Sequence, residues 1–104
     1  MRFTGKVALV TGGGSGQGAA TCLAFGKEGA NVAILDMNIE NAEKVAANVG
    51  NMGRKAIAFK ADVSNSREVN ACVQKTYDEF KHIDILINGA GYGRYVPFAE
   101  LLWR

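Results

Sequence analysis

The sequence of 104 residues contains one proline, two cysteines and no long apolar segment. Its longest apolar runs have the length of strands, far below the ~20 residues that a membrane-spanning helix needs. Cys22 and Cys72 stand apart, so they offer neither a disulfide framework nor the spacing of a metal site, and they favour a reducing, cytoplasmic setting. These absences argue against membrane proteins, disulfide-rich secreted domains and zinc modules.

Charge of one sign is also not concentrated anywhere. The formal net charge is +2, and acidic and basic residues are interspersed along the chain. Without a cluster of lysine and arginine there is no electrostatic footprint for nucleic acid. The length suits one small domain with a core of its own.

Apolar runs of strand length alternate with helical patterns. The runs KVALVT (6–11), NVAILD (31–36), KAIAFKA (55–61) and IDILIN (83–88) predict strands buried on both faces. Helices are predicted over 16–28, from the cap Asn38 to about Asn48, and after Asn65. Gly50 and Gly53 are expected to break the second of these helices. Asn65 and Glu68 have the spacing of a capping box.

This alternation predicts an α/β fold with a Rossmann-like doubly wound parallel sheet. Right-handed crossovers give the strand order 3-2-1-4, with the first two helices on one face and the third on the other. The sheet is incomplete, because the apolar fourth strand has no later strand to pair with. Ligands of such sheets bind at the carboxyl ends of strands near the switch point, here residues 11–18, 36–38, 62–63 and 88–95.

The glycine-rich segment TGGGSGQG (11–18) lies at the first of these strand ends. Its glycines allow a tight turn and close approach of a pyrophosphate, and the following helix offers unpaired N–H groups to an anion. A phosphate-binding P-loop is excluded because Ala19 and Ala20 follow Gly18 where lysine and serine or threonine are required. The strict GxGxxG register also fails, because Gln17 occupies its last glycine position.

The spacing Thr-Gly-x-x-x-Gly-x-Gly resembles the cofactor loop of the short-chain dehydrogenase/reductase family. The resemblance extends to Asp62-Val63 after the third strand and to Asn88-Gly89-Ala90-Gly91 after the fourth. Gln17, Gly89 and Lys81 depart from the family pattern, and Lys81 stands where a glycine commonly ends the third helix. We therefore expect either a left-handed Lys81, at a cost of ~1 kcal/mol, or a different helix end.

The resemblance implies that residues 1–104 are the N-terminal, NAD-binding half of an oxidoreductase. The complete enzyme would transfer hydride between nicotinamide and an alcohol or ketone, and we expect it to be a homo-oligomer. Its catalytic serine, tyrosine and lysine would come from a later segment, so this chain alone is expected to be inactive. The expected cofactor-binding residues are Gly12, Gly14, Ser15, Gly16, Gln17, Gly18, Asp36, Met37, Asp62, Val63, Asn88, Ala90 and Gly91.

Asp36 supports NAD independently of the family. A carboxylate at the end of the second strand can accept hydrogen bonds from both hydroxyls of an adenosine ribose, and it would repel a 2′-phosphate. Met37 follows it, and residues 13–15 are Gly, Gly and Ser, so no cation is present to bind that phosphate. NAD is therefore favoured over NADP.

Tyr77 and Lys81 share a helix face and resemble a catalytic Tyr-x-x-x-Lys pair. They come late in the third helix, ~18 Å from the cofactor edge, so we interpret them as a look-alike. Tyr92, Arg94 and Tyr95 follow the fourth strand and are interpreted as ordinary loop residues, with the border of a substrate pocket as the alternative. His82 is interpreted as a surface residue.

Two other functions stay open. The chain could be a nucleotide-binding module without catalysis, if these residues are the whole natural product. It could also be part of an S-adenosylmethionine-dependent methyltransferase, because Gly14-x-Gly16-x-Gly18 with Asp36 fits the general plan of that fold. Against the second, no acid precedes the loop within the first strand, and 88–91 would have no role.

Overall fold

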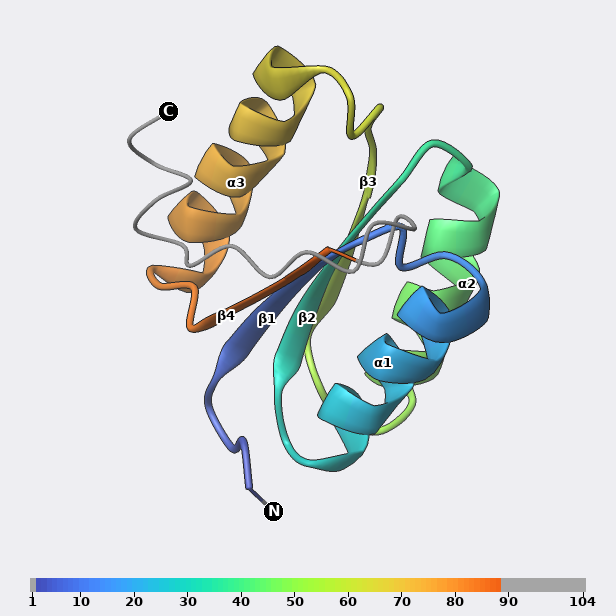
Figure 1. Ribbon diagram of the computed structural model, residues 1–104. Helices are drawn as coiled ribbons and strands as arrows, with labels where there is room; N and C mark the ends of the chain where they lie inside the picture. The colour runs from blue at the N-terminus through green and yellow to red at the C-terminus, as the bar shows by residue number, and fades with distance from the viewer. Residues whose placement is uncertain (1, 89–104) are drawn as a thin grey trace.

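A computed structural model describes residues 2–88. Strands and helices alternate along the chain, and the sheet lies between two helical layers (Figure 1). Each predicted element is present, with ends that differ from the prediction by one or two residues. The elements are β1 (Val7–Thr11), α1 (Gly16–Lys27), β2 (Asn31–Asp36), α2 (Ile39–Gly50), β3 (Ala56–Lys60), α3 (Ser66–Phe80) and β4 (Ile85–Asn88).

The described strands form one parallel sheet in the order β3-β2-β1-β4, which confirms the predicted topology. Thr11 at the end of β1 is in register with Leu35 of β2 on one side and with Asn88 of β4 on the other. The carboxyl ends of the strands therefore meet at one edge, and the switch point falls between β1 and β4.

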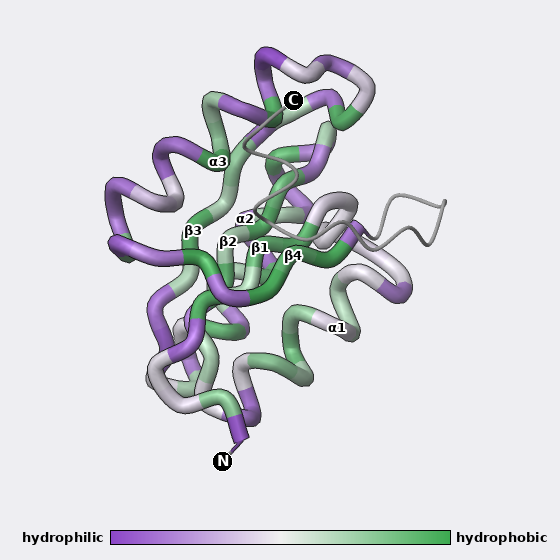
Figure 2. Tube along the Cα trace, turned by 60° about the vertical axis from the view of Figure 1, so that its left-hand side comes forward, coloured by the Kyte–Doolittle hydropathy of each residue, from purple (hydrophilic) through white to green (hydrophobic). Residues whose placement is uncertain are grey.

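Each face of the sheet has its own apolar core, and the alternation along the strands separates them. On the face covered by α3, Leu9 and Leu35 pack with Cys72 and Val73. On the face covered by α1 and α2, the neighbouring strand residues pack with Cys22, Ala42, Val45 and Val49. The central strands are accordingly the most apolar part of the chain in Figure 2. The two cysteines lie on opposite faces of the sheet, and both are buried free thiols.

The N-termini of α2 and α3 are capped by asparagines. The side chain of Asn38 accepts from the N–H of Asn41, and that of Asn65 accepts from the N–H groups of Arg67 and Glu68. The predicted capping box is only half right, because the Glu68 carboxylate accepts from the N–H of Asp62 at 3.3 Å and not from Asn65. The N–H of Asn65 instead donates to the backbone oxygen of Asp62, at 2.9 Å.

The C-termini of the same two helices differ from each other. Lys81 ends α3 in the left-handed conformation (φ 70°), as the prediction allowed, and is the one non-glycine residue with positive φ between residues 2 and 88. The helix α2 extends to Gly50, with Asn51 as its C-cap, so Gly50 does not break it as predicted, while Gly53 with φ 83° turns the chain afterwards.

The amino edge of the sheet, opposite the switch point, is held together by His82. Its Nδ1 lies 3.0 Å from the backbone oxygen of Phe80, and its Nε2 lies 3.0 Å from that of Gly5 and 3.1 Å from Asp84 Oδ2. The same Asp84 oxygen accepts from the N–H of Val7. His82 thus joins the end of α3 to the starts of β1 and β4, which is a structural role at the surface.

None of the helices within residues 2–88 has the length and apolarity needed to span a bilayer.

Candidate cofactor site at the carboxyl edge of the sheet

The glycine turn between β1 and α1 is tied to the neighbouring strand. The N–H groups of Gly12 and Gly13 donate to the backbone oxygen of Leu35 at 2.7 and 3.3 Å, and Gly12 adopts a φ of 64° that suits glycine. A Cβ atom at Gly18 would overlap the backbone oxygen of Gly12, so α1 packs against the turn at a distance that only glycine permits. The turn is therefore a compact backbone surface without side chains over its centre.

The N-terminus of α1 differs from those of α2 and α3 because no side chain caps it. Ser15 occupies the N-cap position in an extended conformation, yet its hydroxyl forms no capping hydrogen bond, and the first turn contains no acidic residue. The first N–H groups of a helix need acceptors, and the helix dipole places partial positive charge there. This N-terminus is suited to an anion such as a phosphate.

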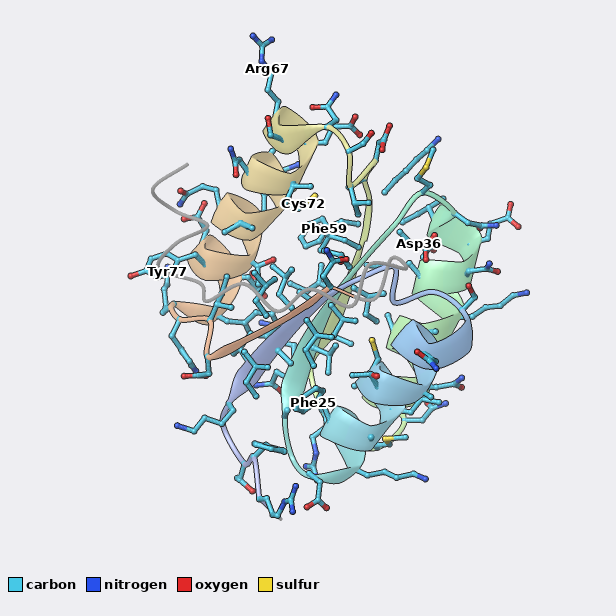
Figure 3. All side chains as sticks on the ribbon, viewed as in Figure 1. Phe25, Asp36, Phe59, Arg67, Cys72 and Tyr77 are labelled. Carbon is cyan, nitrogen blue, oxygen red and sulfur yellow. The ribbon has the colours of Figure 1, made fainter. Side chains whose placement is uncertain are left out.

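Asp36 ends β2 beside the glycine turn. Its Oδ2 accepts from the N–H of Gly14 at 2.9 Å, and its Oδ1 accepts from the N–H of Asn38 at 2.9 Å. A Cβ at Gly14 would lie 2.8 Å from Asp36 Oδ2 and 3.0 Å from the backbone nitrogen of Ala42. The predicted NAD-selecting acid thus adjoins the turn and the start of α2 (Figure 3).

Thr11 and Asn88 meet across the switch point. The Thr11 hydroxyl donates to Asn88 Oδ1 at 2.9 Å, joining the ends of β1 and β4. This bond fixes the orientation of the Asn88 amide at the edge where the ligand is expected. Thr11 was not among the predicted site residues, although its place at the end of a strand that pairs with the Asn88 strand was a usable signal.

The ends of β2 and β3 expose apolar side chains next to polar ones. Met37 is 64% exposed and Val63 39% exposed, and each follows a strand-end region at the carboxyl edge. Asp62 Oδ1 accepts from the backbone N–H and the hydroxyl of Ser64, at 2.9 and 2.7 Å, and these bonds hold the Asp62 pKa below its ordinary value of 3.8. Exposed apolar groups beside two carboxylates suit an adenine ring and its ribose better than a metal ion, and residues 2–88 contain no group of three metal-ligating side chains.

Cys22 of α1 lies directly beneath the glycine turn. A Cβ at Gly13 would lie 2.9 Å from Ile34 Cγ2 and 3.0 Å from Cys22 Sγ, so the thiol supports the turn from the core. Burial raises the pKa of this thiol to about 12, which keeps it protonated and unreactive at neutral pH. Cys22 was not among the predicted site residues.

Tyr77 lies far from this edge, toward the end of α3, while Asp36 lies across the sheet from it (Figure 3). The Tyr77 side chain is 46% exposed, and Lys81 is the exposed left-handed residue that ends the helix. The structure thus places this pair at the end of α3 away from the glycine turn, as predicted, and the absence of a catalytic role stays a prediction. The predicted site residues Ala90 and Gly91, and the loop residues Tyr92, Arg94 and Tyr95, lie outside the described part of the chain.

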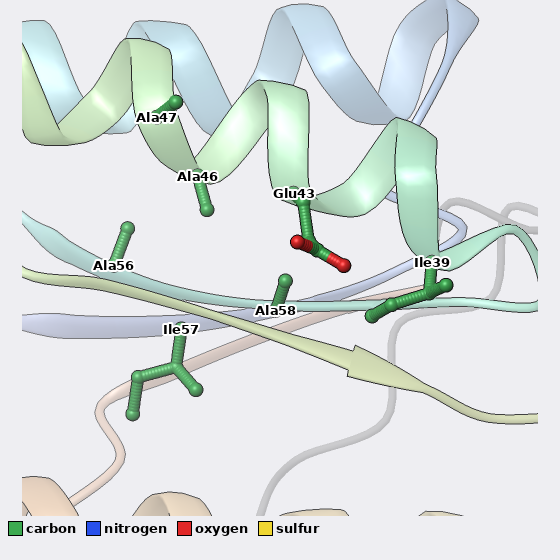
Figure 4. Close-up of a pocket in the computed structure, with 7 residues that line it drawn as sticks. All are labelled: Ile39, Glu43, Ala46, Ala47, Ala56, Ile57 and Ala58. Atoms are coloured by element: carbon green, nitrogen blue, oxygen red, sulfur yellow. The ribbon is translucent and has the colours of Figure 1, made fainter.

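A shallow groove of about 520 Å³ lies between α2 and β3, away from the predicted cofactor residues (Figure 4). Short alanine side chains leave the space between helix and edge strand, and the Glu43 carboxylate lies within it. The groove contains no residue of the glycine turn and no strand-end acid. It is a consequence of small side chains at the sheet edge and not part of the site.

Comparison with known proteins identifies the family. The family model described as short chain dehydrogenase matches residues 6–103. The chain belongs to this family. Among curated relatives, the D-threitol dehydrogenase of Mycolicibacterium smegmatis is 44% identical over 101 residues, which cover 97% of this chain and 39% of that protein. The sorbitol dehydrogenase of Cereibacter sphaeroides is 40% identical over 101 residues, 97% of this chain and 38% of that protein.

Solved structures agree with the family assignment. The NAD+-bound structure of a xylitol dehydrogenase superposes with a TM-score of 0.84 at 42% identity, covering 88% of this chain and 35% of that one. A levodione reductase gives a TM-score of 0.78 at 38% identity over 83% of this chain and 34% of that one. The chain thus spans a little over a third of the length of the relatives it matches.

Proposed function

We propose that a complete protein carrying this chain is an NAD-dependent oxidoreductase, in which residues 1–104 form the N-terminal cofactor-binding part. It would transfer hydride between nicotinamide and the carbon of an alcohol or ketone. The observation that carries the proposal is the uncapped N-terminus of α1 beside a glycine turn at the switch point of the sheet. The other two helices that begin at this edge have side-chain caps, so α1 alone among them keeps its donors for a ligand.

The residues at this edge fit the parts of a dinucleotide. The turn would receive the pyrophosphate, because a Cβ at Gly14 or Gly18 has no room and backbone N–H groups are the available donors. The predicted set there is Gly12, Gly14, Ser15, Gly16, Gln17 and Gly18. Asp36 and Met37 would contact the adenosine ribose and its surroundings, Asp62 and Val63 the adenine, and Asn88, with Ala90 and Gly91, the nicotinamide side. Bound NAD would supply the hydride acceptor, or donor in the reduced form.

Asp36 supports NAD over NADP as the cofactor. Each of its oxygens accepts one backbone N–H, and a carboxylate oxygen can accept a second bond, so both keep capacity for a ribose hydroxyl. A 2′-phosphate would meet the same negative charge at close range. Residues 13–15 of the turn are glycine, glycine and serine, so they include no cation that would offset the repulsion between Asp36 and a 2′-phosphate.

Relatives named for polyols (threitol, sorbitol and xylitol) favour an alcohol or ketone of that class as the first substrate to test. Others are named for a hydroxysteroid, so the substrate class is not fixed by the family alone.

We place the protein in the cytoplasm, supported by two buried free thiols, and expect a homo-oligomer. Residues 2–88 place no tyrosine–lysine pair next to the turn, so these residues alone should not catalyse hydride transfer.

The test is equilibrium binding of NADH, NADPH and S-adenosylmethionine to the complete protein, followed by kcat/KM with NAD and NADP. We expect NADH to bind most tightly, and Asp36→Ala to narrow or reverse the preference for NAD. Equal kcat/KM ratios in wild type and Asp36→Ala would refute the ribose assignment. Tighter binding of S-adenosylmethionine than of NADH would refute the proposed function.

A further inference from the structure

The Asp36 carboxylate connects three backbone segments through its two oxygens. It joins the end of β2 to Gly14 in the turn, 22 residues earlier in the sequence, and to Asn38 at the N-cap of α2, with both N···O distances at 2.9 Å. A residue needed only to bind a ribose has no need of the first of these bonds. The bond to Gly14 places the turn relative to the strand that carries the carboxylate.

The packing at Gly14 matches this bond. A Cβ added at Gly14 would lie 2.8 Å from Asp36 Oδ2 and 3.0 Å from Asn41 Cβ. The turn therefore packs against the carboxylate and the first turn of α2 with no side chain between them. The helix α1 begins at Gly16, two residues after the bonded N–H. The position of Gly14 therefore sets where the uncapped N-terminus of α1 lies.

We propose that Asp36 is a positioning residue that holds the glycine turn in its cofactor-binding shape, in addition to any contact with ribose. The contact with ribose rests on the proposed function, whereas the positioning of the turn is a property of the ligand-free protein. The two roles are compatible, because each oxygen uses one acceptor position for a backbone N–H and keeps another for a hydroxyl. Substitution of Asp36 then affects binding of the pyrophosphate as well as of the adenosine.

Amide hydrogen exchange in the ligand-free protein tests the positioning role directly. In Asp36→Ala the Gly14 amide should exchange at least about tenfold faster than in wild type, because a hydrogen bond to a carboxylate is lost. Asp36→Asn is isosteric but has a single acceptor oxygen, so either Gly14 or Asn38 should lose protection. Asn38→Ala is the matched control: it removes the side-chain cap of α2 and keeps the backbone N–H that bonds Asp36, so Gly14 should be unaffected. A Gly14 amide that is unprotected in wild type, or equally protected in Asp36→Ala, overturns the proposal.

Calorimetric binding of two ligands separates positioning from ribose recognition. The ligands are NADH and an NADH analogue whose adenosine ribose lacks both hydroxyls. If Asp36 acted on the ribose alone, Asp36→Ala should bind the analogue as tightly as wild type or more tightly, because no carboxylate is left unpaired. With positioning, Asp36→Ala should bind the analogue at least about fivefold more weakly, in protein shown by circular dichroism to be folded. Equal or tighter binding by the variant overturns the proposal, and failure of wild type to bind NADH refutes the proposed function while the exchange result still decides the positioning role.

Discussion

The helices α1 and α3 both begin at the carboxyl edge of the sheet, yet their first turns are built in opposite ways. The start of α3 is closed by Asn65, which accepts two N–H groups, and by the Asp62–Ser64 and Glu68 bonds around it. The start of α1 follows glycines and a serine that caps nothing. Both helices begin with unpaired backbone N–H donors and the same dipole, so the difference comes from side chains. Side-chain acceptors for these donors stabilise the start of α3, whereas their absence at α1 leaves the donors available to a ligand.

The largest effect should come from giving the open turn a side chain. In Gly18→Ala the new Cβ would overlap the Gly12 oxygen, and since that atom belongs to the backbone it cannot simply rotate away. We expect a loss of about 2 to 3 kcal/mol in the free energy of unfolding, and NADH binding should be abolished. Urea unfolding and calorimetry provide the measurements.

Gly50→Ala is the matched control for this variant. Gly50 is the last residue of α2, and nothing lies within 4 Å of a Cβ there. Alanine should therefore stabilise the protein by about 0.5 to 1 kcal/mol. Equal stability of the two variants would mean that the turn tolerates a shift of α1. It would contradict the inference that the contact between Gly18 and Gly12 fixes the start of α1.

Exchanging the caps for alanine should separate stability from binding. Asn65→Ala removes the acceptor of two N–H groups and should cost about 1 kcal/mol. Ser15→Ala removes a hydroxyl without a capping bond and should cost less than ~0.5 kcal/mol. For NADH affinity the order should reverse, with Ser15→Ala the weaker binder. Unfolding in urea and NADH titration of both variants check the prediction, and a larger stability loss in Ser15→Ala would contradict it.

The closed start of α3 should also show a small dependence on pH. The bonds from Ser64 lower the pKa of Asp62, so the ionised form is favoured in the folded protein. The resulting stability is present above the unfolded value of about 3.8 and is lost as pH falls through the lower, folded pKa. Asp62→Asn retains one oxygen able to accept both Ser64 bonds but not the charge. The advantage of wild type over Asp62→Asn in urea unfolding should therefore shrink below about pH 3.8, and a difference that stays constant would contradict this assignment.

The sequence predicted the fold well because the signals for it are local or follow from handedness. Uniform apolar runs mark strands buried on both faces, and right-handed crossovers leave the order 3-2-1-4, which the structure has. The errors are at element ends, where neighbouring groups compete: Glu68 bonds Asp62 and not Asn65, and α2 continues through Gly50. Such choices depend on the distances between segments, which the sequence does not contain.

The candidate site was predictable in its residues and not in its internal contacts. The spacing of the glycines and the acid at the end of β2 predicted which backbone and which carboxylate lie together at the candidate site. The bonds Gly14–Asp36 and Thr11–Asn88 join residues 22 and 77 positions apart, and Cys22 supports the turn from the core. The two bonds have no local sequence signal, because they arise when parallel strands bring their carboxyl ends together, and the Cys22 contact depends on how α1 packs beneath the turn.

The smallest effect on activity is expected at the C-terminal end of α3, where Tyr77 and Lys81 have the spacing of a catalytic Tyr-x-x-x-Lys pair. The helix has 15 residues, or about 22 Å at 1.5 Å per residue, and these two come at its end, away from the edge where the turn lies. In the complete protein Tyr77→Phe and Lys81→Ala should leave kcat within about threefold, because neither side chain would touch the reacting atoms. Lys81→Gly removes the same amine and also relieves the left-handed conformation, so it should be more stable than Lys81→Ala by about 1 kcal/mol. Steady-state kinetics and urea unfolding of the three variants provide the measurements. Loss of a true general acid/base costs at least ~10²-fold, so a loss of that size in folded Tyr77→Phe would place the chemistry on α3 and contradict the interpretation of this pair as non-catalytic.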